Sequence, residues 1–192
     1  MNVTEVKTRL LNLETIFKEK ENELTDLDRA IGDGDHGVNM VRGFENLKEK
    51  VDDQSMQALF KSTGMTLMSN VGGASGPLYG FSFIKMANVV NDEIDKDNLK
   101  EVLKAFSEGV KQRGKVELNE KTMYDVIERT REAIENDETI DVNKLQSFAN
   151  LTKDMVATKG RASYFNEASK GYIDPGAQSS VYILNAIIGG ES

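Results

Sequence analysis

Apolar residues recur along the chain at the spacing of amphipathic helices. The first segment carries two neighbouring apolar rows with a seven-residue repeat: Val3, Leu10, Phe17 and Leu24, and beside them Val6, Leu13 and Leu27. Strand-like alternation is absent from the two segments that follow. The pattern predicts eight helices, at about residues 3–27, 40–51, 56–67, 77–89, 99–114, 123–134, 142–156 and 175–188.

Turn and capping residues set the expected helix boundaries. The two prolines, Pro77 and Pro175, occupy positions typical of a first helical turn, where a missing N–H costs nothing. We expect Ser75 or Gly76 to cap the fourth helix and Thr122 to cap the sixth. Short connections favour an all-α, antiparallel up-and-down bundle or barrel. The methionines that fall in helical segments are expected in its core: Met40, Met65, Met68 and Met86.

The composition is that of one globular domain spanning residues 1–192. Hydrophobic residues make up 39% and charged residues 29%, without a long apolar run, which argues against a disordered or membrane-spanning chain. The net charge of −8 offers no general attraction to nucleic acid or anionic membranes, so we expect neither as a partner. Zero cysteines exclude disulfides, a thiolate nucleophile and cysteine-based zinc sites. The first residues lack signal-peptide features, and the cytoplasm is the expected compartment.

One glycine-rich loop contains three carboxylates within eight residues. They belong to Asp28, Asp33 and Asp35, and such hard oxygen ligands beside small residues suit Mg²⁺ or Ca²⁺. We expect Asp28 at the C-terminal end of the first helix, where an acid opposes the macrodipole and gains nothing structurally without a cation. Helix capping and Asx turns explain one of these aspartates but not all three.

A calcium EF-hand does not fit this loop. If Asp33 and Asp35 supplied the first two ligands, position six would be Val38, where the turn requires glycine. Position twelve would be Phe44 in place of a bidentate glutamate. Magnesium held partly by the phosphate groups of a ligand is the better match.

Two further loops have the residues that bind anions. Residues 69–77, rich in glycine and serine, lead into a helix N-terminus, although they lack the Gly-Lys-Ser/Thr ending of a Walker A loop. Residues 158–164 contain Arg161, whose planar guanidinium suits phosphate oxygens, and residues 174–177 begin another helix. Taken alone, either of these loops before a helix N-terminus could also be an ordinary capped turn.

The strings AIGDGDHG, VGGASGPLYG, ATKGRASY and DPGAQSS occur in this order between about Asp28 and Ser180. This combination resembles the nucleotide-binding L subunits of bacterial dihydroxyacetone kinases. The resemblance implies an eight-helix antiparallel barrel whose loops hold ADP or ATP and two Mg²⁺ ions at one end.

The resemblance also implies roles for individual residues. Asp28, Asp33 and Asp35 match the metal-binding aspartates, and together with Arg161 they are the expected catalytic residues. The positions that match phosphate and nucleotide contacts are His36, Gly37, Val38, Asn39, Ala74, Ser75, Gly114, Met123, Arg161, Asp174, Pro175 and Gly176. One departure lies beside the adenine positions, where Asn119-Glu120 replaces the Gly-Asp that the family often has.

Charge supports a two-metal site independently of the resemblance. A bound diphosphate carries a charge of about −3, and three aspartates carry about −3 more. These negative charges cannot share a small site without cations. Two Mg²⁺ ions restore near neutrality. In phosphoryl transfer the protein mainly positions reactants and stabilises charge, so this set of residues suffices without a side-chain nucleophile.

The function implied by the resemblance is phosphoryl transfer to dihydroxyacetone held on a partner subunit K. Because no sugar-binding domain is fused to these residues, the expected type keeps ADP bound as a coenzyme, which a phosphohistidine subunit M of the phosphotransferase system rephosphorylates. The alternatives are an ATP-dependent kinase subunit, a non-catalytic nucleotide-binding regulator, and a structural bundle with a merely solvated acidic loop. A phosphohistidine at His36, the single histidine, is the alternative to a simple phosphate contact there.

Overall fold

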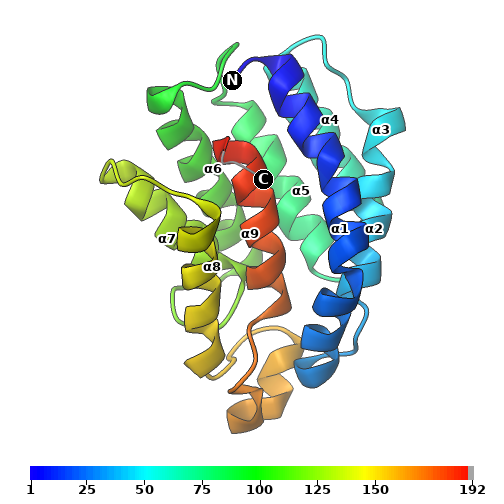
Figure 1. The fold of residues 1–192 in the computed structure, drawn as a ribbon, viewed down its shortest axis with the longest axis vertical. Helices are drawn as coiled ribbons and strands as arrows, with labels where there is room; N and C mark the ends of the chain where they lie inside the picture. The colour runs from blue at the N-terminus through cyan, green and yellow to red at the C-terminus, as the bar shows by residue number, and fades with distance from the viewer. Residues whose placement is uncertain (190–192) are drawn as a thin grey trace.

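A computed structural model describes residues 1–189, which form an all-helical structure, as the sequence predicts (Figure 1). Its helices run as follows: α1 Val3–Ile31, α2 His36–Glu45, α3 Leu47–Lys50, α4 Met56–Asn70, α5 Ser75–Ala87, α6 Lys96–Gly114, α7 Met123–Glu135, α8 Val142–Leu151 and α9 Pro175–Ile188. Two 3₁₀ segments, η1 Thr152–Asp154 and η2 Arg161–Ser169, precede α9. In the described residues, no helix is both long enough and apolar enough to cross a membrane.

Local capping residues explain several of the boundaries. Thr122 caps α7 as expected, because its hydroxyl accepts from the Tyr124 N–H while the Asp125 carboxylate accepts from the Thr122 N–H. Pro175 occupies the first turn of α9, and the Asp174 side chain caps that helix. These two N-termini matter because both open into the loop region where the site residues are expected.

Three helix predictions were wrong in detail. Residues 40–51 form two helices, because α2 ends at Glu45 and the short α3 begins at Leu47. Helix α5 begins at Ser75 behind Ala74, so neither expected residue caps it; Pro77 is still within the first turn, where its missing N–H costs nothing. Helix α8 ends at Leu151, where the 3₁₀ turn of η1 takes over.

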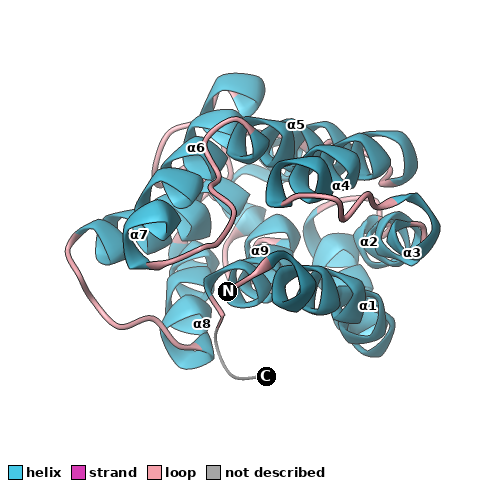
Figure 2. Ribbon diagram, turned by 90° about the horizontal axis from the view of Figure 1, so that it is seen from above, coloured by secondary structure: helices cyan, strands magenta, loops and turns pink. Residues whose placement is uncertain are grey.

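Helices that follow one another along the chain pack side by side. Contacts join α1 to α2, α2 to α4, and each later α-helix to the next as far as α9, which returns to contact α1 (Figure 2). Helix α9 also contacts α7. The end of α1 and the segment η2 lie at the lower end of the molecule in Figure 1, opposite the N-terminus. The barrel form itself stays a prediction.

The buried core follows the apolar stripes, with one correction. Met40 and Met86 are fully buried, as expected. Met65 and Met68 are instead 56% and 43% exposed, so the prediction that they lie in the core was wrong. Helix α4 buries a stripe that includes Leu59, Phe60, Thr63 and Leu67, and the two methionines lie outside that stripe. The location of a methionine in a helix was therefore not enough to predict that its side chain is buried.

This difference predicts opposite outcomes for two methionine truncations. Met86→Ala removes a fully buried side chain and should lower the free energy of unfolding by about 2–5 kcal/mol, because it leaves a cavity. Met65→Ala removes an exposed side chain and should change it by less than about 0.5 kcal/mol. Urea unfolding followed by circular dichroism measures both; equal losses would contradict the assigned orientation of α4.

Candidate functional site

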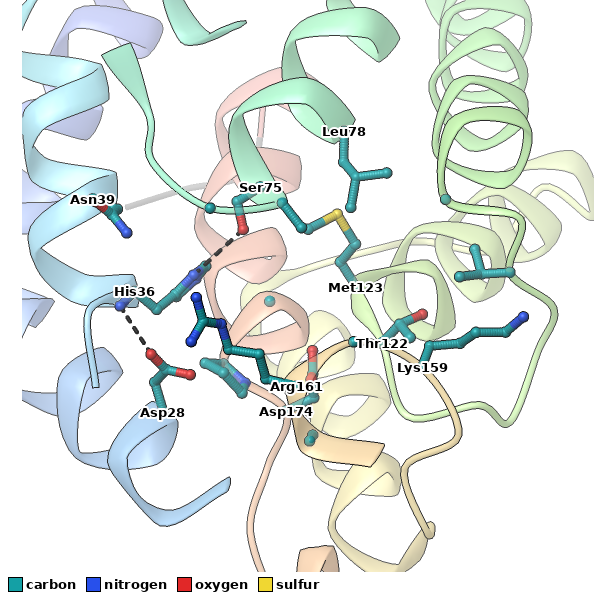
Figure 3. A pocket seen from close by; sticks show the side chains of 18 of the residues that line it. Asp28, His36, Asn39, Ser75, Leu78, Thr122, Met123, Lys159, Arg161 and Asp174 are labelled. Carbon is teal, nitrogen blue, oxygen red and sulfur yellow. Dashed lines mark hydrogen bonds between the residues drawn. The ribbon is translucent and has the colours of Figure 1, made fainter. Parts of the chain in front are cut away.

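A pocket of about 520 Å³ lies where three loop regions meet, the acidic loop that follows α1, the loop at residues 69–77 and the segment at residues 158–177. The site residues expected from the sequence that line it are Asp28, Asp33, Asp35, His36, Asn39, Ala74, Ser75, Gly114, Met123, Arg161, Asp174, Pro175 and Gly176. Gly37 and Val38 do not line it: Gly37 is buried close to the backbone of α1, and Val38 is 51% exposed. Figure 3 shows Asp28 and His36 on one side of the pocket and Leu78 and Met123 on the other.

The acidic side of the pocket is built around Asp28, in the last turn of α1. One of its carboxylate oxygens accepts hydrogen bonds from two backbone N–H groups, that of Asp35 at 2.8 Å and that of His36 at 3.1 Å. Figure 3 shows the bond from His36. The expectation that Asp28 gains nothing structurally was therefore wrong, since it receives the first N–H groups of α2. Gly32 is required beside it, because a Cβ there would lie 2.2 Å from the other carboxylate oxygen.

The three aspartates have the geometry of a cation site. One carboxylate oxygen from each of Asp28, Asp33 and Asp35 lies within 4.8 Å of the others. Burial raises the pKa of Asp28, and the neighbouring charges of Asp33 and Asp35 act in the same direction, while its backbone hydrogen bonds lower it. The Arg161 guanidinium lies 2.6 Å from Asp33. Hard oxygen ligands this close together suit Mg²⁺, and the residues present fit that ion.

Three helix N-termini open into the same pocket. His36 begins α2, Ser75 begins α5, and Pro175 begins α9, and all three residues line the pocket. The positive ends of their helix dipoles favour an anion. Arg113, Lys159 and Arg161 also line the pocket and add positive charge. The pocket therefore joins an acidic cation site to a region suited to phosphate.

His36 is held in a buried network of hydroxyl groups. Its Nε2 lies 3.0 Å from the Ser179 hydroxyl, and its Nδ1 lies 3.4 Å from the Ser75 hydroxyl. Burial lowers the pKa of His36 to about 4, against the weaker opposing effect of the Asp35 charge. The Tyr79 hydroxyl lies 2.8 Å from Ser179 and continues the network into α9. The imidazole is consequently neutral at physiological pH.

The loop before α9 is fixed by a buried lysine and a buried aspartate. Lys121 is 1% exposed, and its ammonium donates to the backbone carbonyls of Thr152 and Tyr172. The Asp174 carboxylate accepts from the Ala177 N–H at 2.8 Å, and its own N–H donates to the Thr152 hydroxyl at 3.0 Å. Burial raises the pKa of Asp174 to about 7, although the Ala177 hydrogen bond and Lys121 lower it.

Sequence reasoning missed most of the apolar side of the pocket. Beside Met123 this side is formed by Ile31, Leu78, Val110 and Val116. Gly114 leaves room there, because a Cβ at this position would lie 3.2 Å from the Leu78 side chain. Val110 belongs to an expected helical stripe, and no local signal in the sequence marked Ile31, Leu78 and Val116 as pocket residues. An apolar slot beside a phosphate region suits the flat base of a nucleotide.

Comparisons with known proteins identify similar chains. The DAK2 domain family matches residues 30–189. The ADP-binding subunit DhaL of PEP-dependent dihydroxyacetone kinase 1 from Listeria innocua is 45% identical, covering 89% of this chain and 88% of that protein. The ADP-binding subunit DhaL of the Escherichia coli PEP-dependent dihydroxyacetone kinase is 39% identical over 96% of this chain and 95% of its own length.

The fold also matches solved structures. The dihydroxyacetone kinase of C. freundii in its native form gives a TM-score of 0.73 at 20% identity, over 97% of this chain. Its complex with AMP-PNP and Mg²⁺ gives a TM-score of 0.66 at 21% identity, over 98% of this chain. The chain spans about a third of that kinase, 34% and 33% in the two structures.

The raised pKa of Asp174 predicts a pH-dependent stability difference. Between the unfolded value of 3.8 and the folded value of about 7, the folded state retains a proton that the unfolded state has lost. The contribution of the Asp174 carboxyl to the free energy of unfolding is therefore fully present below about pH 4 and is lost as the pH rises through 7. Asp174→Asn retains a capping side chain but cannot titrate, so it should not show this loss.

The measurement is urea unfolding of both proteins across this pH range. The other titrating groups are common to both, so the difference in stability between variant and wild type isolates Asp174. As the pH rises, the free energy of unfolding of Asp174→Asn should increase relative to that of the wild type. Parallel pH profiles would show that Asp174 titrates normally.

Proposed function

Because the chain belongs to the DAK2 domain family, we propose that it is the ADP-carrying phosphotransferase subunit of a dihydroxyacetone kinase. The observation that carries this proposal is the meeting of an acidic cluster, three helix N-termini and an apolar slot in one pocket. Each of these three features suits one part of a metal-bound nucleotide: the metal, the phosphates and the base.

The proposed arrangement assigns each part of the nucleotide to named residues. The base lies in the slot between Leu78 and Met123, beside Gly114. The phosphates lie at the N-termini of α2, α5 and α9, and Arg161 donates to their oxygens. Asp28, Asp33 and Asp35 would hold two Mg²⁺ ions, which neutralise phosphate charge when bound. Arg161 now pairs with Asp33, so it is already directed toward this site.

In this proposal, the terminal phosphoryl group of the bound ATP passes to dihydroxyacetone on the partner subunit K, which leaves ADP in the pocket. A phosphohistidine subunit M of the phosphotransferase system then transfers its phosphoryl group to this ADP and regenerates ATP. The names of two relatives, which describe ADP-binding subunits of PEP-dependent kinases, support a bound ADP and PEP as the source of the phosphoryl group. His36 is the single histidine of the chain, and it is 9% exposed with Nε2 directed at Ser179. That placement favours a role in holding the site over a role as phosphate carrier.

Removing one carboxylate charge should strongly weaken metal-dependent nucleotide binding. In Asp28→Asn, the side chain still offers an oxygen to the Asp35 and His36 N–H groups, but the charge is lost. The affinity for ADP in the presence of Mg²⁺ should fall by about 100-fold or more, since even outer-shell partners of a metal contribute 10- to 100-fold. Isothermal titration calorimetry with and without Mg²⁺ measures this.

Asp26→Asn is the matched control on the same helix. Asp26 is exposed and pairs with Arg29 outside the pocket, so its replacement should leave ADP affinity unchanged. Equal affinities in wild type, Asp28→Asn and Asp26→Asn would refute the metal site.

The coenzyme role of ADP predicts that the nucleotide stays bound through many turnovers. Several loops and two metal ions would surround it, so its release should be slow relative to catalysis. Protein loaded with radiolabelled ADP is mixed with the dihydroxyacetone-binding subunit and a phosphorylated donor protein, and the label is followed during turnover. Retained label supports the proposal. Exchange with unlabelled ATP once per turnover, with activity sustained by ATP alone, would favour the ATP-dependent alternative.

A further inference from the structure

Arg161 pairs with one of the three carboxylates that are expected to bind metal. Its guanidinium lies 2.6 Å from an oxygen of Asp33. One oxygen each of Asp28, Asp33 and Asp35 lies within 4.8 Å of the others. Figure 3 shows the Arg161 side chain directed toward the side of the pocket that carries Asp28 and His36. A side-chain cation therefore lies at the edge of the cluster that the aspartates form.

A divalent cation and the Arg161 guanidinium compete for the Asp33 carboxylate. A metal ion that uses the same oxygen displaces the guanidinium. A metal ion on the other oxygen lies only a few ångströms from the guanidinium, where charges of the same sign repel even at the effective dielectric near a protein surface. Mg²⁺ also loses its bound water reluctantly. Separating Arg161 from Asp33 therefore adds to the free-energy cost of binding a metal ion alone.

A phosphate group at the neighbouring helix N-termini reverses this balance. Arg161 lines the same pocket as Ser75 and Pro175, which begin α5 and α9. Phosphate oxygens accept two parallel hydrogen bonds from a guanidinium, as carboxylate oxygens do. The guanidinium therefore exchanges one anionic partner for another, and Asp33 becomes available to the metal ion. After the exchange, each positive group still has a negative partner.

The segment that carries Arg161 permits this exchange. Its far end is anchored, because the Ser169 hydroxyl accepts from the Ala157 N–H at 2.9 Å. Around Arg161 the segment is open. Gly160 has a φ of +61°, and a Cβ there would meet no atom within 4 Å beyond the neighbouring residues. The Arg161 side chain itself is 68% exposed, so it can turn from Asp33 to a phosphate while the anchored end stays in place.

We propose that Arg161 is a specificity-determining residue that lets the acidic cluster distinguish a metal–nucleotide complex from a free divalent cation. Arg161 opposes a cation that arrives alone and favours one that arrives together with phosphate. Metal binding and phosphate binding are thereby coupled through one side chain. The phosphate part rests on the proposed function, whereas the competition for Asp33 is a property of the protein without nucleotide.

Replacing Arg161 should move two affinities in opposite directions. In Arg161→Gln no guanidinium competes with a lone cation, so the affinity for that cation should rise about fivefold, the upper range for an exposed ion pair. The affinity for ADP with Mg²⁺ should fall about fivefold or more, because the loss of a charged donor to phosphate outweighs the competition that is removed. A residue that only binds phosphate would leave the first affinity unchanged, and one that only supports the fold would lower both.

Mn²⁺ without nucleotide is the probe for the first affinity. It prefers the same oxygen ligands as Mg²⁺, and the electron paramagnetic resonance signal of the free ion is lost on binding. Competition by Mg²⁺ then gives the affinity for Mg²⁺ itself. Isothermal titration calorimetry with ADP in excess Mg²⁺ measures the second affinity. Circular dichroism checks that each variant keeps the helix content of the wild type.

Two further variants separate the charge of Arg161 from its shape. Lys170→Gln removes a positive charge next to the same segment, where Lys170 pairs with Glu167 at 2.9 Å and does not line the pocket. Both affinities of this control should stay within about twofold of the wild type, because solvent and salt screen an exposed charge. Arg161→Lys keeps the charge without the planar guanidinium. It should bind Mn²⁺ as the wild type does, but bind ADP with Mg²⁺ more weakly.

A Mn²⁺ affinity of Arg161→Gln equal to or below that of the wild type, including no measurable binding to either protein, would overturn the proposal. Unchanged binding of ADP with Mg²⁺ in Arg161→Gln would also overturn it. A wild type that does not bind ADP with Mg²⁺ would refute the proposed function and the phosphate part of the exchange. The Mn²⁺ titration would in that case still decide the competition at Asp33.

Discussion

The bond between the Asp28 carboxylate and the start of α2 is the interaction on which the site depends. Asp28 belongs to the last turn of α1, yet it accepts the N–H groups of Asp35 and His36 across the intervening loop. This contact folds residues 32–35 back on themselves and brings Asp33 and Asp35 close to Asp28. It also directs the N-terminus of α2 into the pocket. One carboxylate therefore organises both the acidic cluster and the neighbouring N-terminus of α2.

Electrostatic balance explains why so many charged and polar groups meet at this end. Three carboxylates in a small volume repel one another, and in the described residues Arg161 is the side-chain cation paired with them. The helix N-termini and the lining cations add positive potential on the adjoining side. Under the proposed function, a magnesium-bound nucleotide would complement both sides together, with its metal ions beside the carboxylates and its phosphates beside the helix N-termini.

Helix α9 provides the shared wall of the site and is held from two directions. Lys121 fixes the loop before it through the carbonyls of Thr152 and Tyr172. From the other side, Tyr79 of α5 contacts Gly176 and Ser180 in its first turns. Buried polar groups at such positions must be satisfied, and each of these bonds ties two segments together. The position of α9 beside the pocket therefore depends on side chains that the sequence presents as ordinary members of loops and helices.

The sequence by itself determined the helical class, most helix spans and the three loops that form the site. Periodicity and capping are local properties, so the cap at Thr122 and the start of α9 at Pro175 follow from neighbouring residues. Only the tertiary structure decided that Met65 and Met68 face outward, that Leu78 and Val110 complete an apolar slot, and that Tyr79 meets Ser179 and Ser180. These contacts join residues far apart in the chain, and no local pattern specifies how helices rotate against one another when they pack.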